Sequence, residues 1–437
     1  MRAVLRAARM QRSPDVNLNL NVRGMAPSAT VAINERLDEM RRAGREVFKL
    51  GLGQSPFPIP EPVVEALRRH ASAKDYLPVK GLPELREAVA ENLAQRQGVV
   101  RSAEQVLVGP GSKELMFLLQ LVYYGDLVLP TPCWVSYAPQ AQIIGRRNCF
   151  IPCRREDRWN LTPEQLDRLC REDRGRPRIV VLNYPNNPTG VTYKLDELKQ
   201  LAKVAREHRV VLLSDEIYGE LHHKGQHVSI ARFYPEGTIV SNGLSKWCGA
   251  GGWRLGAFVF PPGLGWLRDA MAAVASETFT STSAPIQYAA VVGFRGGPWL
   301  DDYLLGARRT LRGLGRWARE VLVAAGVHCE RPDGAFYLFL DCSPLRDRLE
   351  AKGIRTDREL CEHLLEETGV GILPGSDFGR GPEELTARIA YVDFDGGPPI
   401  EEARKLPKGS TPGEDFLRRH CGRTVTAIER VAEWLAG

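Results

Sequence analysis

Short apolar runs alternate with amphipathic helical stretches through the middle of the chain. The runs lie at Val106–Val108, Leu127–Leu129, Ile179–Leu182, Val210–Leu213, Thr238–Val240 and Gly256–Phe260. Helical periodicity between them is clearest at Glu114–Val122, Pro163–Cys170 and Lys194–His208. Strands that alternate with helices in this way predict an α/β fold with a mostly parallel sheet and helices on its faces.

The pattern changes at both ends of this region. Residues 29–53 predict an amphipathic helix and a short strand, and prolines open two further helices, at 60–70 and 81–97. After a long helix (303–325), strands in "GAFYLFLD" and "ARIAYVDF" predict a smaller α+β domain. We therefore expect an extension (1–20), an N-terminal segment that joins the small domain (21–60), a large domain (61–300) and the small domain (301–437). Within the last, residues 396–415 resemble an exposed loop or insertion.

Composition narrows the class of protein. The chain has 437 residues, of which 43% are hydrophobic and 26% charged, as in a globular enzyme. Its net charge of +6 is scattered, which disfavours nucleic acid as a partner, and no apolar run is long enough to span a membrane. The nine cysteines lack metal-ligand spacing, so we expect reduced thiols in a cytosol-like compartment and no metal. The pair His222-His223 is predicted to lie on the surface.

The first residues leave the location open. "MRAVLRAARMQRS" contains four arginines, and the first acidic residue is Asp15. This composition is typical of a mitochondrial transit peptide, but it also suits a disordered start in an arginine-rich proteome. A cytoplasmic location is the prediction, with mitochondrial import as the alternative.

Polar side chains follow each predicted strand, where ligands bind in open α/β sheets. The segments are "GPGSKE", "PTPCWVSY", "NYPNNPTG", "SDEIY" and "SNGLSKWCGAGGWRLG". Gly111 and Ser112 stand where a helix begins and could bind a phosphate, although neither nucleotide-binding glycine motif is present. Asp215 taken alone could be a helix cap. Lys246 lies in a segment without acids, which suits either a solvated lysine or an amine of lowered pKa for Schiff-base chemistry.

The order and spacing of these segments resemble the pyridoxal-phosphate aminotransferases of fold type I, the aspartate aminotransferase family. "NNPTG", "SDEIY", and "SK" followed eight residues after the lysine by "R-x-G" carry the resemblance, together with "YLPVKGLPELREAV" and "ARIAY". It covers Asn17 to Val392. It implies a homodimer that exchanges amino groups between small amino acids and 2-oxo acids.

The resemblance also implies roles around a bound pyridoxal 5′-phosphate. Lys246 would carry the cofactor as a Schiff base and move the substrate proton as general base and acid. Asp215 would pair with the pyridinium nitrogen, which would lower the pKa of its carboxyl. Asn187 and Tyr218 would donate to the 3-oxygen of the ring, while Trp134 and Ile217 would pack against its two faces.

The remaining implied roles concern the phosphate and the substrate. The phosphate would be held by Arg254, Ser245, the amides of Gly111, Ser112 and Lys113, and Tyr76 of the neighbouring subunit. Arg388 would bind the substrate α-carboxylate with help from the backbone at Gly53. The sequence departs from many relatives at Gly243, where they carry Ser or Thr.

The reaction outcome stays open on the sequence alone. A lyase, a cyclising synthase or an oxidase would use the same lysine and aspartate. Lys113 stands at the start of a predicted helix, where the helix dipole disfavours a cation. In some members of the family that use acidic substrates, a lysine at the matching position binds the distal carboxylate, so the resemblance implies a dicarboxylic substrate such as aspartate or glutamate. A solvated lysine is the alternative.

Overall fold

The computed structural model describes residues 17–407 and 409–437. The transit-peptide interpretation concerns the first 16 residues and lies outside this range. Within the described residues, no helix is both long and apolar enough to cross a membrane.

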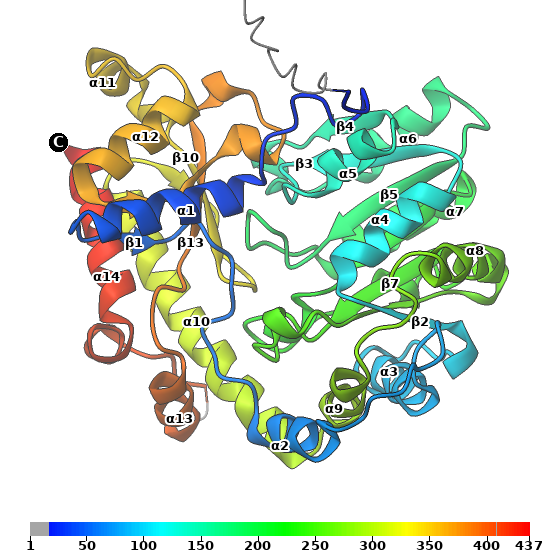
Figure 1. The fold of residues 1–437 in the computed structure, drawn as a ribbon. Coiled ribbons are helices and arrows are strands. Elements are labelled where there is room, and N and C mark those ends of the chain that lie inside the picture. The colour runs from blue at the N-terminus through cyan, green and yellow to red at the C-terminus, as the bar shows by residue number, and fades with distance from the viewer. Residues whose placement is uncertain (1–16, 408) are drawn as a thin grey trace, which may run out of the picture.

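A seven-stranded sheet forms the larger half of the molecule (Figure 1). In spatial order its strands are β2 (Val106–Gly109), β8 (Gly256–Val259), β7 (Thr238–Gly243), β6 (Val211–Asp215), β5 (Arg178–Asn183), β3 (Asp126–Thr131) and β4 (Asn148–Pro152). Strand β8 runs antiparallel to both of its neighbours, and the other pairs are parallel. The predicted mostly parallel sheet is confirmed, whereas β4 was not among the expected runs.

Alternating residues place the strands between two helical layers. Leu127 and Leu129 face a core shared with α4 (Ser112–Val122), α5 (Tyr137–Ile143) and α8 (Gly265–Ser276), while Val128 faces α6 (Pro163–Glu172) and α7 (Leu195–Glu207). Near β2 and β8, the helices α2 (Glu61–His70), α3 (Pro83–Gln97) and α9 (Ala284–Arg295) belong to a further core cluster. Burial on both faces explains why these strands are apolar throughout.

A smaller antiparallel sheet lies beside the first (Figure 1). Its order is β12 (Leu373–Pro374), β13 (Thr386–Ala390), β10 (Tyr337–Asp341) and β9 (His328–Cys329). The N-terminal segment, with α1 (Ala29–Arg42), joins this half through parallel pairing of β1 (Phe48–Lys49) with β11 (Val370–Gly371). The other helices are α10 (Pro298–Ala324), α11 (Arg346–Ala351), α12 (Asp357–Thr368), α13 (Gly397–Lys405) and α14 (Glu414–Ala436). The domain boundaries at residues 20, 60 and 300 stay a prediction.

Two expectations from the sequence are wrong. Residues 396–415 are not simply a loop, because α13 forms within them and buries Ile400 and Ala403 against α10. A Cβ on Gly306 would lie 2.5 Å from the Ile400 oxygen, so the missing side chain allows this close contact. His222 and His223 are not surface residues: each is only 7% exposed, and His222 forms a β-bridge with Gly334.

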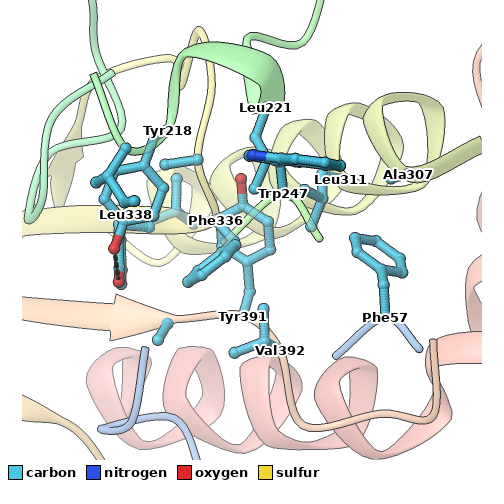
Figure 2. Close-up of a cluster of buried hydrophobic side chains, with 14 of the residues drawn as sticks. Phe57, Tyr218, Leu221, Trp247, Ala307, Leu311, Phe336, Leu338, Tyr391 and Val392 are labelled. Carbon is cyan, nitrogen blue, oxygen red and sulfur yellow. Dashed lines mark hydrogen bonds between the residues drawn. The ribbon is translucent and has the colours of Figure 1, made fainter. Parts of the chain in front are cut away.

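One core cluster joins the two halves (Figure 2). Tyr218 and Trp247, which follow β6 and β7, belong to the same cluster as Phe336, Tyr391 and Leu311 of α10. The loops that follow these two strands are therefore anchored by packing on both sheets, and the polar side chains that they carry are held in place.

Candidate active site

A pocket of 390 Å³ opens at the carboxyl ends of the parallel strands. Its lining consists of Ser112, Lys113, Trp134, Asn183, Asn187, Asp215, Ile217, Tyr218, Ser245, Lys246 and Arg254. Every one of these except Asn183 was singled out from the sequence. The structure thus brings together residues that lie up to 142 positions apart, because parallel strands end at one edge of the sheet.

Lys246 reaches into the pocket from the loop after β7. Its Nζ donates a hydrogen bond to the carbonyl oxygen of Gly53 at 2.7 Å. Burial, together with the nearby cations of Arg388 and Arg254, lowers the pKa of the amine to about 8. About one tenth of the amine is therefore neutral at pH 7, and able to act as a nucleophile or base, and this fraction grows as the pH approaches 8.

Asp215 is the last residue of β6, and only 3% of it is exposed. Burial raises the pKa of its carboxyl to about 6, although a hydrogen bond from the Tyr137 hydroxyl to Oδ2 at 2.6 Å acts in the opposite direction. The hydroxyl of Ser241 lies 3.4 Å from Oδ1. A carboxylate in such a place is well suited to pair with a cationic group of a ligand.

Asn187 and Arg388 form a second polar group. Arg388 is 1% exposed, its Nη1 donates to Asn187 Oδ1 at 3.0 Å, and its Nη2 donates to the oxygen of Gly51. Because Oδ1 of Asn187 accepts from the arginine, its Nδ2 donor remains for a ligand. The Nε of Arg388 is buried and has no hydrogen-bond partner among the described residues.

Tyr218 is buried beside these residues. Its hydroxyl forms a 2.6 Å hydrogen bond with the hydroxyl of Tyr337, drawn as the dashed line in Figure 2. A Cβ on Gly53 would overlap the Tyr337 hydroxyl and lie 2.8 Å from its Cζ. Glycine at residue 53 therefore lets the N-terminal segment approach Tyr337 and Lys246.

The other end of the pocket suits an anion. Ser112 is the first residue of α4, and the first N–H groups of a helix have no intrahelical acceptors. Gly111, with φ of 93°, leaves the space beside the Arg254 guanidinium that a Cβ would fill. Gly243 stands where many relatives carry Ser or Thr. A Cβ at this position would lie 2.7 Å from the oxygen of Leu255, so the position is crowded.

Lys113 is exposed and lies at the junction of two hollows. Its Nζ is 5.1 Å from the centre of the Trp134 ring. Desolvation lowers the pKa of the amine, and Arg254 adds to the effect. Lys113 also lines a larger hollow of 1050 Å³ between α1, α4, α5 and α12, with Phe117 and Pro139 on its wall.

Tyr76 lies apart from the pocket. It is 87% exposed, although it was predicted to contact a phosphate. Tyr76 is not a lining residue of the pocket of its own chain, and its contact with the phosphate of a neighbouring subunit stays a prediction.

Sequence reasoning missed four side chains that contact the predicted ones: Tyr137, Asn183, Ser241 and Tyr337. Asn183 Nδ2 donates to the backbone oxygen of Asp215 at 2.9 Å, and its Oδ1 accepts from the Asn187 amide at 2.8 Å. Tyr137 follows Trp134 in the quoted segment "PTPCWVSY", so its position in that segment is the one available signal. No local sequence motif distinguishes Tyr337 from the other residues of its predicted strand.

Together, the lysine, the buried carboxylate and the anion-binding end define an α/β enzyme whose pocket suits a ligand with both a cation and an anion. Residues 45–393 match the family Aminotransferase class I and II. The aspartate aminotransferase of Geobacillus stearothermophilus is 34% identical over 86% of this chain and 95% of its own length. The aspartate/prephenate aminotransferase of Thermus thermophilus is 35% identical over 83% and 91%.

Solved structures agree with these relatives. The structure of Thermus thermophilus aspartate aminotransferase with maleate superposes with a TM-score of 0.79 at 32% identity, over 89% of this chain and 98% of that chain. The chain therefore belongs to the class I and II aminotransferases and is a transaminase of fold type I. The resemblance drawn from the sequence is confirmed.

Proposed function

We propose that this transaminase uses pyridoxal 5′-phosphate and acts on a dicarboxylic amino acid, with a 2-oxo acid as second substrate. One observation carries the proposal: Ser112, Asn187, Asp215 and Lys246, each at the end of a different strand, line one 390 Å³ pocket. When bound, the cofactor supplies a protonated ring that withdraws electrons from the substrate Cα.

The side chains present fit such a group at both of its ends. Asp215 would pair with the ring nitrogen, and that cation would lower the carboxyl pKa from its burial-raised value of about 6. The space beside Arg254 that Gly111 leaves, the start of α4, and the hydroxyls of Ser112 and Ser245 support phosphate binding. Asn187 Nδ2 and the Tyr218 hydroxyl would donate to the ring oxygen.

Lys246 is the residue that would move the proton. Its Nζ would take the proton from the substrate Cα and later return one. Its pKa of about 8 supports both directions, because an acid–base group works best when its pKa lies near the working pH. The hydrogen bond to the Gly53 oxygen orients the amine when it is not engaged in chemistry.

Arg388 would hold the substrate α-carboxylate. Its guanidinium is fixed by Asn187 and Gly51, and its Nε, which has no hydrogen-bond partner in the part of the chain that the structure describes, supplies a buried donor that a carboxylate would satisfy. Tyr76, which is largely exposed in one chain, would contact the phosphate bound by a second copy. The proposed active unit is therefore a homodimer with shared sites.

The dicarboxylic preference rests on Lys113. This cation stands beside the pocket and faces the adjoining hollow, where it would bind a distal carboxylate. Relatives named for aspartate, and the related structure with maleate, a dicarboxylic acid, support the same class of substrate.

A substrate panel with the purified holoenzyme tests the proposal. Aspartate and glutamate, paired with 2-oxoglutarate or oxaloacetate, should give the highest kcat/KM, and phenylalanine and alanine much lower values. Lys113→Ser should lower kcat/KM for aspartate by about thirtyfold or more. Bound substrate would desolvate this lysine, and losing one partner of a desolvated charge pair costs roughly 2–5 kcal/mol.

Phenylalanine serves as the internal control for that variant. Its kcat/KM should change little in Lys113→Ser. An equal loss on both amino acids would place Lys113 on the cofactor phosphate and remove the support for a dicarboxylic substrate. Ammonia release without amino-group transfer would contradict the proposed reaction.

The 1050 Å³ hollow favours a second candidate for the acceptor, a bulkier dicarboxylic oxo acid. Apolar side chains such as Phe117 and Pro139 could cover a ring, and two relatives from Thermus are named for both aspartate and prephenate. Replacing 2-oxoglutarate by prephenate in the same assay tests this candidate; no transfer to prephenate would exclude it.

A further inference from the structure

A buried polar cluster lies directly behind Asp215 and takes no part in the proposed chemistry. Glu216, the next residue, is 3% exposed, and its carboxylate accepts from three side chains. Oε1 accepts from the hydroxyls of Ser214 at 2.7 Å and Ser229 at 2.5 Å, and Oε2 pairs with Nε2 of His227 at 2.9 Å.

The cluster lies on the far side of the strand from the pocket. Consecutive strand residues face opposite sides, so Ser214 points away from the side that Asp215 faces. Glu216 bonds to Ser214, and its carboxylate is thereby directed away from the cofactor site. A direct catalytic role for this carboxylate is thus excluded by its direction.

His227 packs into the turn that connects Asp215 with Tyr218. Its ring lies 5.2 Å from the ring of Tyr184, whose hydroxyl accepts from the amide of Ile230 at 2.7 Å. A Cβ on Gly219 would lie 2.7 Å from His227 Cδ2. The absence of a side chain at residue 219 therefore permits the histidine to reach Glu216.

The backbone of the same turn is held at several points. The amide of Glu216 donates to the oxygen of Ser241 at 3.0 Å, and the amide of Gly219 donates to the oxygen of Glu216 at 2.8 Å. Burying a carboxylate is costly unless it is fully paired, so a cluster that satisfies both Glu216 oxygens fixes this residue strongly.

We propose that Glu216 and His227 are positioning residues that set the Asp215–Tyr218 turn, so that the Asp215 carboxylate and the Tyr218 hydroxyl face the cofactor. Neither residue touches a reacting atom; both act through the residues at the ends of the turn. The inference rests on the proposed function of the pocket.

Two variants test the inference. Glu216→Gln keeps the volume and the serine contacts but removes the charge, and His227→Phe keeps the ring packing but removes the donor. Asp167→Asn is the matched control, because Asp167 Oδ1 pairs with His208 Nε2 at 2.8 Å beyond the amino end of β6. Three quantities are measured: cofactor affinity of the cofactor-free protein, kcat and KM for aspartate, and amide hydrogen exchange at residues 216–219.

Both variants should weaken cofactor affinity and lower kcat by about 10- to 100-fold, because small misplacements of reacting groups have effects of this size. KM should change much less, since Arg388 lies on a different element, and exchange in the turn should accelerate. Asp167→Asn should resemble the wild type in all three.

Variants that match the wild type in affinity, kcat and exchange would overturn the inference, as would an equal loss in Asp167→Asn. If Glu216→Gln folds while His227→Phe does not, the cofactor affinity, kcat and hydrogen exchange of Glu216→Gln alone test the inference. A wild type that neither binds the cofactor nor transaminates would overturn the proposed function and this inference together, whereas an active wild type with unaffected variants overturns the inference alone.

Discussion

The hydrogen bond from Tyr137 to Asp215 gives a quantitative prediction. It spans 2.6 Å between side chains that are 1% and 3% exposed. Tyr137→Phe removes the donor and keeps the ring. Hydrogen bonds to buried charged groups are worth about 1.5–3 kcal/mol. One pKa unit corresponds to about 1.36 kcal/mol, so the Asp215 pKa should rise by about one to two pH units above its value of about 6.

The sign of the pH effect follows from the charge that the cofactor needs. Asp215 must be ionised to pair with the ring cation, so cofactor affinity should fall as the pH drops through the carboxyl pKa. In titrations of the cofactor-free protein, followed by cofactor absorbance, Tyr137→Phe should lose affinity about one to two pH units higher than the wild type.

Tyr123→Phe is the matched control. Tyr123 is also buried, but its hydroxyl donates to the Arg178 oxygen at 3.3 Å, at the opposite end of the sheet. Its profile should match that of the wild type. An unchanged pH dependence of cofactor affinity in Tyr137→Phe would refute the reasoning. The same shift in Tyr123→Phe would show that a general loss of packing, and not the hydrogen bond to Asp215, is the cause.

Two further substitutions follow from the site. Asp215→Asn should lower kcat on the order of hundredfold. Because burial raises this carboxyl pKa from 3.8 to about 6, ionisation destabilises the fold above about pH 6 and has no effect below about pH 4. Urea unfolding of the cofactor-free variant should therefore show a stability gain that develops between about pH 4 and pH 6 and reaches up to about 3 kcal/mol above pH 6. A loss of stability above pH 6 would contradict the pKa. Gly53→Ala should displace Tyr337 and cost about 1–3 kcal/mol of stability. The control, Gly263→Ala, should cost little because no atom lies within 4 Å of the added Cβ. Equal thermal unfolding temperatures of the two variants would contradict the close contact between residue 53 and Tyr337.

The strand-end residues could be predicted because local patterns fix where parallel strands end. Asn187, Asp215 and Lys246 each follow an apolar run, and the geometry of a parallel sheet brings those ends to one edge. The resemblance to the aminotransferase family then implies a role for each residue. No long-range packing detail is needed for this step.

Contacts between distant segments could not be predicted in this way. Tyr137 lies 78 residues from Asp215, and their contact depends on how α5 lies over the sheet rather than on any local pattern. The burial of His222 likewise depends on its bridge to Gly334. Residues 396–415 appeared to be a loop because of their glycines and prolines, yet prolines suit the first turn of a helix, and Gly306 lets α13 pack closely on α10.

The central claim is that Lys246 carries the cofactor in a transaminase, and borohydride reduction followed by peptide mass spectrometry tests it most directly. Lys113 lines the same pocket and is the alternative lysine to which the cofactor could be attached. The reduced holoenzyme should carry the cofactor mass on the peptide that contains Lys246, and Lys246→Ala should carry none and show no turnover. A label on the Lys113 peptide, or full turnover in Lys246→Ala, would contradict the account.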